Sequence, residues 1–386
     1  MNFSVFHSTV LFFLASFLSG SSLYALDYVE FQYREEIRKE EGRIVIPADD
    51  GVVFEARDGK YYIISSENII SKRSDDTVFT PYTKKEIIER LKTEFPDTEG
   101  YDLLVNDHFL VVYTTSEGFA RWYSILLESL YDGYTKFWKR LGIMLEEPAY
   151  PMVAVILSNQ PDLVRYAQTD GFTLFDKQIA YYNQFTNRVV LCDLSGVQTY
   201  REGERGRASS REKQAFLNHP DAARNVATVV HEATHLVGFS CGMHERFAPN
   251  PYWILEGLAV FHEVPDLKKR EGWSIAPKVS PYRMRDLIKY LQTNPHQPLQ
   301  KIIENDAPFK HPATAGESYA MTWGLTYYLV KRRPLELAAY LKLLQEKSPL
   351  SSDAPDIRIT DFEKCFGSDW NKLYKDCGDY LLKLKY

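Results

Sequence analysis

Residues 225–238 read NVATVVHEATHLVG, and this stretch decides the fold that we expect. Alanine, valine and threonine recur in and just before it at the spacing of one helix face, at positions 223, 226, 227, 230, 234 and 237. Asn218 and Pro220 are start signals for such a helix, and Gly238 is a stop signal. The pattern therefore predicts a helix that ends at Gly238.

The sequence HEATH at residues 231–235 places two histidines one helical turn apart. His231 and His235 then share a helix face, so both imidazole rings can reach a single metal ion. Glu232 follows the first histidine and would point toward a water on that ion. Two histidines that only pack against other side chains would give the same short motif, so a third ligand has to decide.

Two residues compete for the place of third ligand. Cys241 ends the pattern H-E-x-x-H-x-x-G-x-x-C, at the position where metzincins have a histidine. A thiolate there would bind zinc strongly but would tend to close the site. Glu256, together with two histidines, would leave a fourth position open for water, as catalytic zinc sites do. We therefore expect His231, His235 and Glu256 to bind one Zn²⁺ ion.

The segment around Glu256 is predicted to form a second helix. Asn250 and Pro251 are typical of a helix N-cap and first turn, so Glu256 would lie early in that helix. Gly257 and Ala259 are small, and we expect them to let this helix approach the HEATH helix closely.

The two segments together resemble a known class of enzyme. HEATH followed by W-x-x-E-G-x-A at residues 253–259 resembles the gluzincin metallopeptidases, which are zincins. More narrowly, the chain is similar to the secreted gluzincin-like family catalogued as domain of unknown function 1570. Its shared features are HEATHL at 231–236 with CGM at 241–243, FHEVPD at 261–266, GW at 272–273, YAMTW at 319–323, and an amino-terminal β module leading into SKRSDD at 71–76. The resemblance covers most of the chain after its first 25 residues.

This resemblance implies a fold and a reaction. The fold would be α+β, with a zincin-like (gluzincin) catalytic domain containing a mixed sheet and an active-site helix, preceded by a small all-β, barrel-like module. The reaction would be hydrolysis of peptide bonds by a metal-activated water, with Glu232 as general base.

The group that stabilises the oxyanion is assigned by analogy. Related gluzincins use a tyrosine or histidine from a downstream helix, and we assign this role to Tyr319. A core or surface position for Tyr319 fits the sequence as well, and His244, His262 and His311 are rival candidates.

One position departs from the family pattern. Thermolysin-like gluzincins have a carboxylate four residues after the glutamate ligand, where it orients a zinc histidine, and this chain has Val260 there. A backbone carbonyl or Glu263 would have to replace it. Gluzincin substrates also lie along an edge strand before the metal helix, a role that fits residues 180–183 and 187–191, although a core hairpin is equally compatible.

The first 25 residues resemble a secretory signal peptide. An uncharged apolar run at 10–18 precedes small residues up to Ala25, although no Lys or Arg comes before it. A short membrane anchor is the alternative, but the run is well below the ~20 residues that a membrane span needs. We expect export to the periplasm or the extracellular space, with no stable span after signal removal.

The remaining chain is expected to form a β-rich module at 27–78, a linker and helix at 79–99, and the peptidase domain at 100–386. Short strands separated by aspartate-glycine turns are predicted at 29–33, 43–46, 52–56 and 61–64, and they indicate a small antiparallel barrel or a curled sheet. In the peptidase domain we expect strands at 108–113, 152–157, 178–183 and 188–192, a helix at 117–141, a solvated charged loop at 195–218, and mainly helices after 220.

Composition excludes several classes of protein. The chain is 45% hydrophobic and 25% charged, which excludes a disordered chain and a membrane bundle. Its net charge of −6 and lack of a basic block argue against a nucleic-acid partner. The four cysteines allow two disulfides without indicating their pairing: Cys192, Cys241, Cys365 and Cys377.

Two functions remain open, and a peptide or protein is the partner in both. The chain is a zinc peptidase, or it is a catalytically silent zincin-fold protein that binds peptides or proteins outside the cytoplasm. Silent relatives commonly lose the glutamate of H-E-x-x-H, and Glu232 is present, so we prefer the enzyme. A purely structural zinc is disfavoured because three ligands leave the site open. The oligomeric state is not predicted.

Overall fold

The computed structural model describes residues 24–174, 178–193, 217–218, 222–269, 272–275, 278–293 and 299–385. The expected signal peptide, apart from its last two residues, and the expected charged loop, apart from 217–218, lie outside these ranges. The chain divides into two compact units, one comprising Met1–Arg57 with Tyr62–Thr80 and the other Asp58–Tyr61 with Pro81–Tyr386.

The amino-terminal unit is built on one five-stranded sheet in the order β4-β3-β2-β1-β5. The strands are β1 (Ala25–Tyr33), β2 (Glu36–Ala48), β3 (Gly51–Ala56), β4 (Tyr61–Ser65) and β5 (Ile69–Val78), and a 3₁₀ turn, η1 (Ser66–Asn68), precedes β5. Antiparallel ladders join β1 to β2, β1 to β5 and β2 to β3. Phe31 and Phe54 lie in the apolar cluster on one face of this sheet.

Of the barrel and the curled sheet that the sequence allowed, the barrel is wrong, because this sheet is open. β4 and β5 are its two ends, and each end strand has a single neighbour. β5 was not predicted as a strand, since its sequence reads IISKRSDDTV, and its side chains are exposed or half-buried throughout. A strand without an apolar inward face offers little burial to drive closure of the sheet.

The second unit contains a mixed five-stranded sheet in the order β6-β7-β8-β10-β9. Its strands are β6 (Asp102–Val105), β7 (Phe109–Tyr113), β8 (Met152–Leu157), β9 (Ala180–Asn183) and β10 (Arg188–Cys192). β8 pairs in parallel with β7 and β10, while β6 and β9 run antiparallel to their neighbours. The α+β class and the mixed sheet are thereby confirmed, and β9 is an edge strand.

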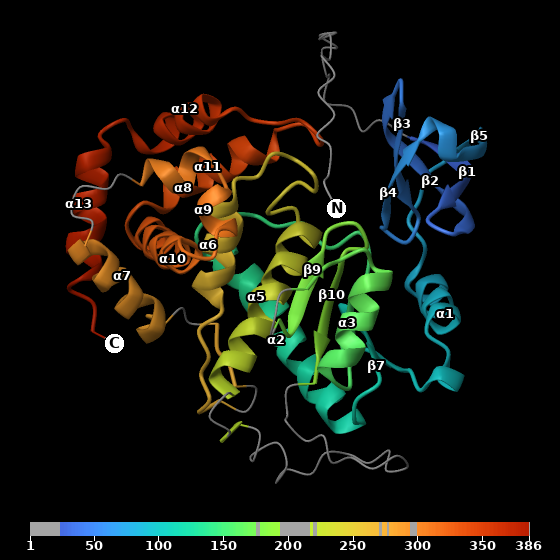
Figure 1. The fold of residues 1–386 in the computed structure, drawn as a ribbon, viewed down its shortest axis with the longest axis horizontal. Coiled ribbons are helices and arrows are strands. Elements are labelled where there is room, and N and C mark those ends of the chain that lie inside the picture. The colour runs from blue at the N-terminus through green and yellow to red at the C-terminus, as the bar shows by residue number, and fades with distance from the viewer. Residues whose placement is uncertain are drawn as a thin grey trace. The chain divides into compact units, whose positions relative to one another are not determined.

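Helices cover both faces of the mixed sheet, as Figure 1 shows. Val111 and Ala154 lie in the cluster that includes α2 (Glu117–Arg140) and α5 (Ala222–Ser240). Val112 and Val155 face the opposite way, in the cluster with α1 (Lys84–Glu94) and α3 (Gln160–Thr169). Burial on both faces explains why the central strands read as continuous apolar runs.

A helical region follows the sheet, as predicted. It comprises α6 (Tyr252–His262), α7 (Pro281–Thr293), α8 (Gln300–Glu304), α9 (Ala307–Lys310), α10 (Ala315–Arg332), α11 (Pro334–Gln345), α12 (Pro355–Phe366) and α13 (Trp370–Leu381). α10 is buried at almost every position from Ser318 to Val330, so it forms the centre of this region. In the described parts of the chain, no helix combines the length and apolarity that crossing a membrane requires.

The end of α5 differs from the prediction. The helix continues past Gly238 to Ser240, and Gly242, with φ of +71°, takes the left-handed position after it. Gly238 serves packing instead, because a Cβ there would lie 3.3 Å from His244 Cδ2 and 3.4 Å from Tyr134 Oη. A glycine that permits close packing and a glycine that ends a helix look alike in sequence.

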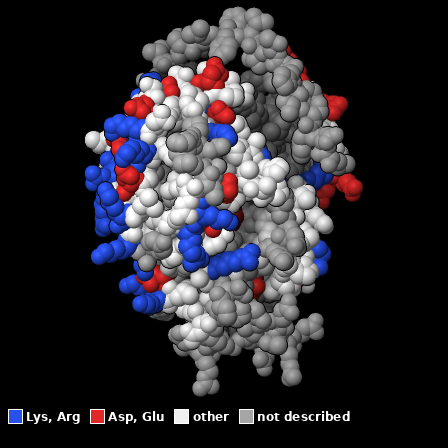
Figure 2. All heavy atoms as spheres, turned by 60° about the vertical axis from the view of Figure 1, so that its left-hand side comes forward, with Lys and Arg blue, Asp and Glu red and all other residues white. Residues whose placement is uncertain are grey.

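Surface charge shows both signs intermixed on the face drawn in Figure 2. Lys and Arg side chains form several separate groups there, with Asp and Glu side chains among them.

An ion pair between a buried arginine and a partly exposed glutamate joins α1 to the mixed sheet. Arg188, 4% exposed, donates to both Glu94 oxygens at 2.7 and 2.8 Å, and Lys60 lies 3.0 Å from the same carboxylate. Burial opposes ionisation, but Arg188 and Lys60 together hold the pKa of Glu94 far below its usual value. The pair therefore contributes stability above about pH 4.5, and this contribution is lost as the pH falls below that value.

We predict that Glu94→Gln lowers the free energy of unfolding by roughly 2–3 kcal/mol at neutral pH, because Arg188 is left buried without its counter-ion. We expect a loss near the lower of these two values, because the Glu94 side chain is 37% exposed and water screens its charge. Urea unfolding measures the loss, which should shrink in acid. Glu89→Gln is the control, because its pair with Lys92 is exposed and worth under ~0.5 kcal/mol. Equal stability of the two variants would contradict this assignment.

Candidate metal centre

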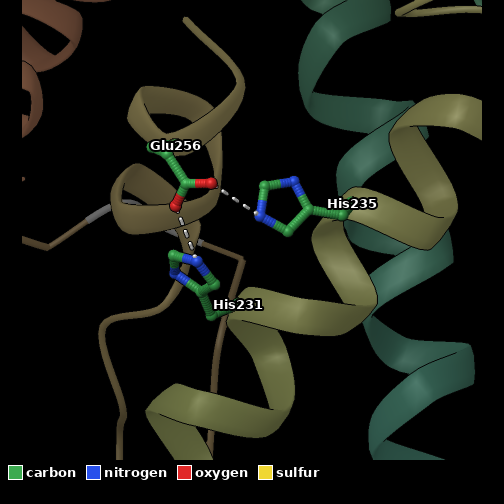
Figure 3. A group of neighbouring side chains, drawn as sticks. All are labelled: His231, His235 and Glu256. Atoms are coloured by element: carbon green, nitrogen blue, oxygen red, sulfur yellow. Dashed lines mark hydrogen bonds and ion pairs between the residues drawn. The ribbon is translucent and has the colours of Figure 1, made fainter. Parts of the chain in front are cut away.

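Three predicted ligands meet between helices α5 and α6. Figure 3 shows His231 and His235 projecting from α5 toward Glu256 on α6. Glu256 Oε2 lies 3.1 Å from His231 Nε2, and Oε1 lies 3.6 Å from His235 Nε2. One donor atom from each residue lies within 4.8 Å of the others, and the side chains are only 11–13% exposed. These three residues could hold a metal ion.

The start of α6 depends on a residue far along the chain. Pro251 is the N-cap, and the Tyr252 amide donates to Asp306 Oδ1 at 3.1 Å, while Arg358 binds both Asp306 oxygens. Asn250 instead donates its side-chain amide to Glu245 O at 2.7 Å. The predicted start, with Asn250 as N-cap and Pro251 as the first helical residue, is therefore one residue early. The acceptor for the first helical amide is Asp306, a distant residue that local sequence could not indicate.

Gly257 brings α6 close to α10, not to α5 as predicted. A Cβ at Gly257 would clash with Thr326 Oγ1 and lie 3.5 Å from Thr322 Oγ1. Thr322 donates its hydroxyl to the Trp253 carbonyl at 2.6 Å, across the same contact. The glycine thus lets α6 pack on the buried helix α10, and this contact sets the position of the neighbouring Glu256.

Glu263 supports the first histidine from behind. Its Oε2 lies 2.9 Å from His231 Nδ1, and its Oε1 accepts from Arg283 Nε and Nη2 at 3.1 and 3.0 Å. Val260, at the position where thermolysin-like gluzincins have a carboxylate, is fully buried in the apolar core. Of the two substitutes that the sequence allowed, the structure places Glu263 at the histidine.

Glu232 points toward the edge strand. Its Oε2 accepts a hydrogen bond from the Tyr182 amide of β9 at 3.0 Å. Burial raises the pKa of Glu232 to about 7, His231 opposes the rise and Glu256 adds to it. Because the amide of Tyr182 faces Glu232, it is directed away from the ladder with β10.

Tyr319 on α10 also lies close to the three candidate ligands. Its ring centroid is 6.4 Å from that of His231, and it interacts electrostatically with Glu256. Burial, with the Glu256 charge added, raises the pKa of Tyr319 well above its usual value, so the phenol keeps its proton. Arg283, which no sequence pattern indicated, lies over the Tyr319 ring at 5.4 Å.

The rival residues lie elsewhere. Cys241 is fully buried in the apolar core and is not among the three residues grouped around Glu256. His262 is buried among aromatic rings of α2, His244 packs beside Gly238, and His311 is exposed at the end of α9. All four cysteines are unpaired thiols here.

The donor set suits zinc. Two imidazole nitrogens and one carboxylate from two packed helices are ligands that Zn²⁺ accepts, and three protein ligands leave a coordination position open. The outer ring nitrogen of His231 is bound to a carboxylate, as in many metal-ligating histidines.

Comparison with known proteins gives one family. Residues 225–351 match DUF1570, described as a protein of unknown function. The match includes α5 from Asn225 onward, α6 and α10, hence the whole group around Glu256, but not the amino-terminal sheet or the mixed sheet. It is narrower than the resemblance drawn from sequence. No curated protein matches the chain.

We predict that Gly257→Ala lowers the free energy of unfolding by about 1–3 kcal/mol, because α6 must move away from Thr326. The shift carries Glu256 with it, so affinity for added Zn²⁺ should fall as well. Gly378→Ala is the matched control, since its Cβ would meet nothing within 4 Å on α13 and should stabilise by roughly 0.5–1 kcal/mol. Thermal unfolding and zinc titration measure both effects, and unchanged zinc affinity in Gly257→Ala would count against the α6–α10 contact as the determinant.

Proposed function

We propose that this chain is an exported zinc peptidase of the gluzincin type, which hydrolyses peptide bonds of a peptide or protein outside the cytoplasm. The observation that carries the proposal is the convergence of His231, His235 and Glu256 beside the buried carboxylate of Glu232. The match to DUF1570 covers these residues but names no activity. Export, to the periplasm or the extracellular space, rests on residues 1–25 alone.

His231, His235 and Glu256 would hold the zinc ion, which when bound would supply Lewis-acid polarisation of a carbonyl and acidify a water. Glu232 would accept the proton of the attacking water and pass it to the leaving amine. The Tyr182 amide holds one Glu232 oxygen, so it orients the base. A pKa raised toward neutrality by burial suits a group that both takes and gives a proton.

The oxyanion would be stabilised by Tyr319. Its phenol keeps its proton and lies at the same group as the base, so it can donate to an oxygen on which negative charge develops.

The substrate would lie extended along β9. That strand is the edge of the mixed sheet, and its Tyr182 amide points toward Glu232. A peptide added there would use backbone hydrogen bonds, which would fix its direction past the metal group.

We predict that purified protein binds one Zn²⁺ per chain and cleaves peptides, and that Glu232→Gln keeps the zinc but lowers kcat by about 10²–10⁴-fold. Glu256→Ala should lose zinc, because one of three ligands is gone. Zinc content by mass spectrometry and cleavage of a peptide library measure these effects.

The outcomes separate the two functions kept open by the sequence. Bound zinc without cleavage of any library peptide would favour the silent binding protein. Unchanged zinc affinity in Glu256→Ala would show that the ligand assignment is wrong. Glu245→Gln serves as control, since Glu245 is an exposed glutamate outside the group.

We also predict that Tyr319→Phe lowers kcat by about 10²–10³-fold with little change in zinc content, because only the donor to the oxyanion is removed. Tyr327→Phe, on the same helix and outside the group, is the control. Steady-state kinetics on the best library peptide measure the effect. A Tyr319→Phe enzyme as fast as wild type would transfer the role to another donor.

A further inference from the structure

We propose that Arg283 on α7 is a positioning residue that sets the metal affinity of the site through Glu263. This inference rests on the zinc site of the proposed function and not on peptide cleavage. Arg283 is linked to the site by a short chain of contacts. Its Nε and Nη2 donate to Glu263 Oε1 at 3.1 and 3.0 Å, and Glu263 Oε2 lies 2.9 Å from His231 Nδ1.

The contacts of His231 with Glu263 and Glu256 would determine which of its nitrogens binds a metal ion. An ionised carboxylate only accepts hydrogen bonds, so Nδ1 of His231 is the donor to Glu263. A neutral ring that binds a metal would keep this proton on Nδ1 and use the lone pair of Nε2, the nitrogen on the side of the Glu256 carboxylate. A fixed Glu263 thus presents the ligating nitrogen in the direction of the other two ligands.

Glu263 needs a cation to stay fixed. Its side chain is 12% exposed, and it lies close to a second buried carboxylate, since Glu256 contacts the same histidine. Two buried negative charges around one imidazole are costly unless they are paired. Arg283 is itself only 17% exposed, so its charge acts on Glu263 with little screening by water.

A second contact of Arg283 reaches the other side of the group. Its guanidinium lies 5.4 Å from the centre of the Tyr319 ring, and the centroid of that ring lies 6.4 Å from that of His231. One side chain from α7 therefore contacts two neighbours of the candidate ligands, Glu263 at the C-cap of α6 and Tyr319 on α10. The planar guanidinium suits both contacts, because two of its nitrogens share one carboxylate oxygen while its face covers a ring.

The test measures zinc affinity, by competition with a chromophoric chelator, for wild type, Arg283→Gln, Glu263→Gln and the double variant. We expect each single variant to bind Zn²⁺ about 10–100-fold more weakly. If Arg283 acts through Glu263, the double variant should be within roughly threefold of Glu263→Gln, since the two changes remove one interaction. Arg285→Gln is the matched control: it lies on α7, is exposed, and should leave the affinity unchanged.

Two further measurements exclude a merely structural role. Far-UV circular dichroism of the metal-free variants should match wild type, which shows that they fold, and the absorption spectrum of bound Co²⁺ should change in Arg283→Gln but not in Arg285→Gln. If Arg283→Gln does not fold, Arg283→Lys replaces it and should show an intermediate affinity, because it keeps the charge without the planar fork.

Two results would overturn the inference: wild-type zinc affinity in Arg283→Gln or its lysine substitute, or a double variant whose loss is the product of the two single losses. Failure of the wild-type protein to bind Zn²⁺ would instead refute the proposed zinc site itself, so the two failures are distinguishable.

Discussion

A buried carboxylate held between two imidazole rings is the interaction on which the site depends. Glu256 lies 3.1 Å from His231 and 3.6 Å from His235, from a helix separate from theirs. Such a group is costly to bury unless each charge finds a partner, so both helices have to be placed accurately. The packing around α5 and α6 is therefore part of the site's chemistry.

Three contacts supply this accuracy, and each comes from a different place in the chain. The mixed sheet and α2 hold α5 on one side, since the same apolar cluster includes all of them. α10 holds α6 through the space that Gly257 leaves for Thr326. α7 holds His231 through Arg283 and Glu263. The three candidate ligands are thus held in place by elements that lie far from them in the sequence.

Much of the site was predictable because it depends on residues that are close together in the sequence. The one-turn spacing of His231 and His235 depends only on helix geometry, and the central strands were visible as apolar runs of strand length. The wrong predictions arose where one sequence feature, such as a glycine, has two possible structural roles. Gly238 was interpreted as a helix stop and Gly257 as the point of close approach to α5, but the neighbour that each admits is His244 in one case and Thr326 in the other. β5 was missed because a polar edge strand has no apolar pattern.

The sequence by itself determined the candidate donor set, since the residue types and their spacing specify two imidazoles on one helix with a carboxylate beside them, and a glutamate on a second helix. Only the tertiary structure decided what surrounds them. Glu263, and not a backbone carbonyl, contacts His231 Nδ1, and Arg283 contacts Glu263. The Tyr182 amide donates to Glu232, and the amino-terminal sheet is open. The physical reason is that the spacing of His231 and His235 follows from the geometry of one helix. The contacts that surround the ligands depend instead on how distant helices and strands pack.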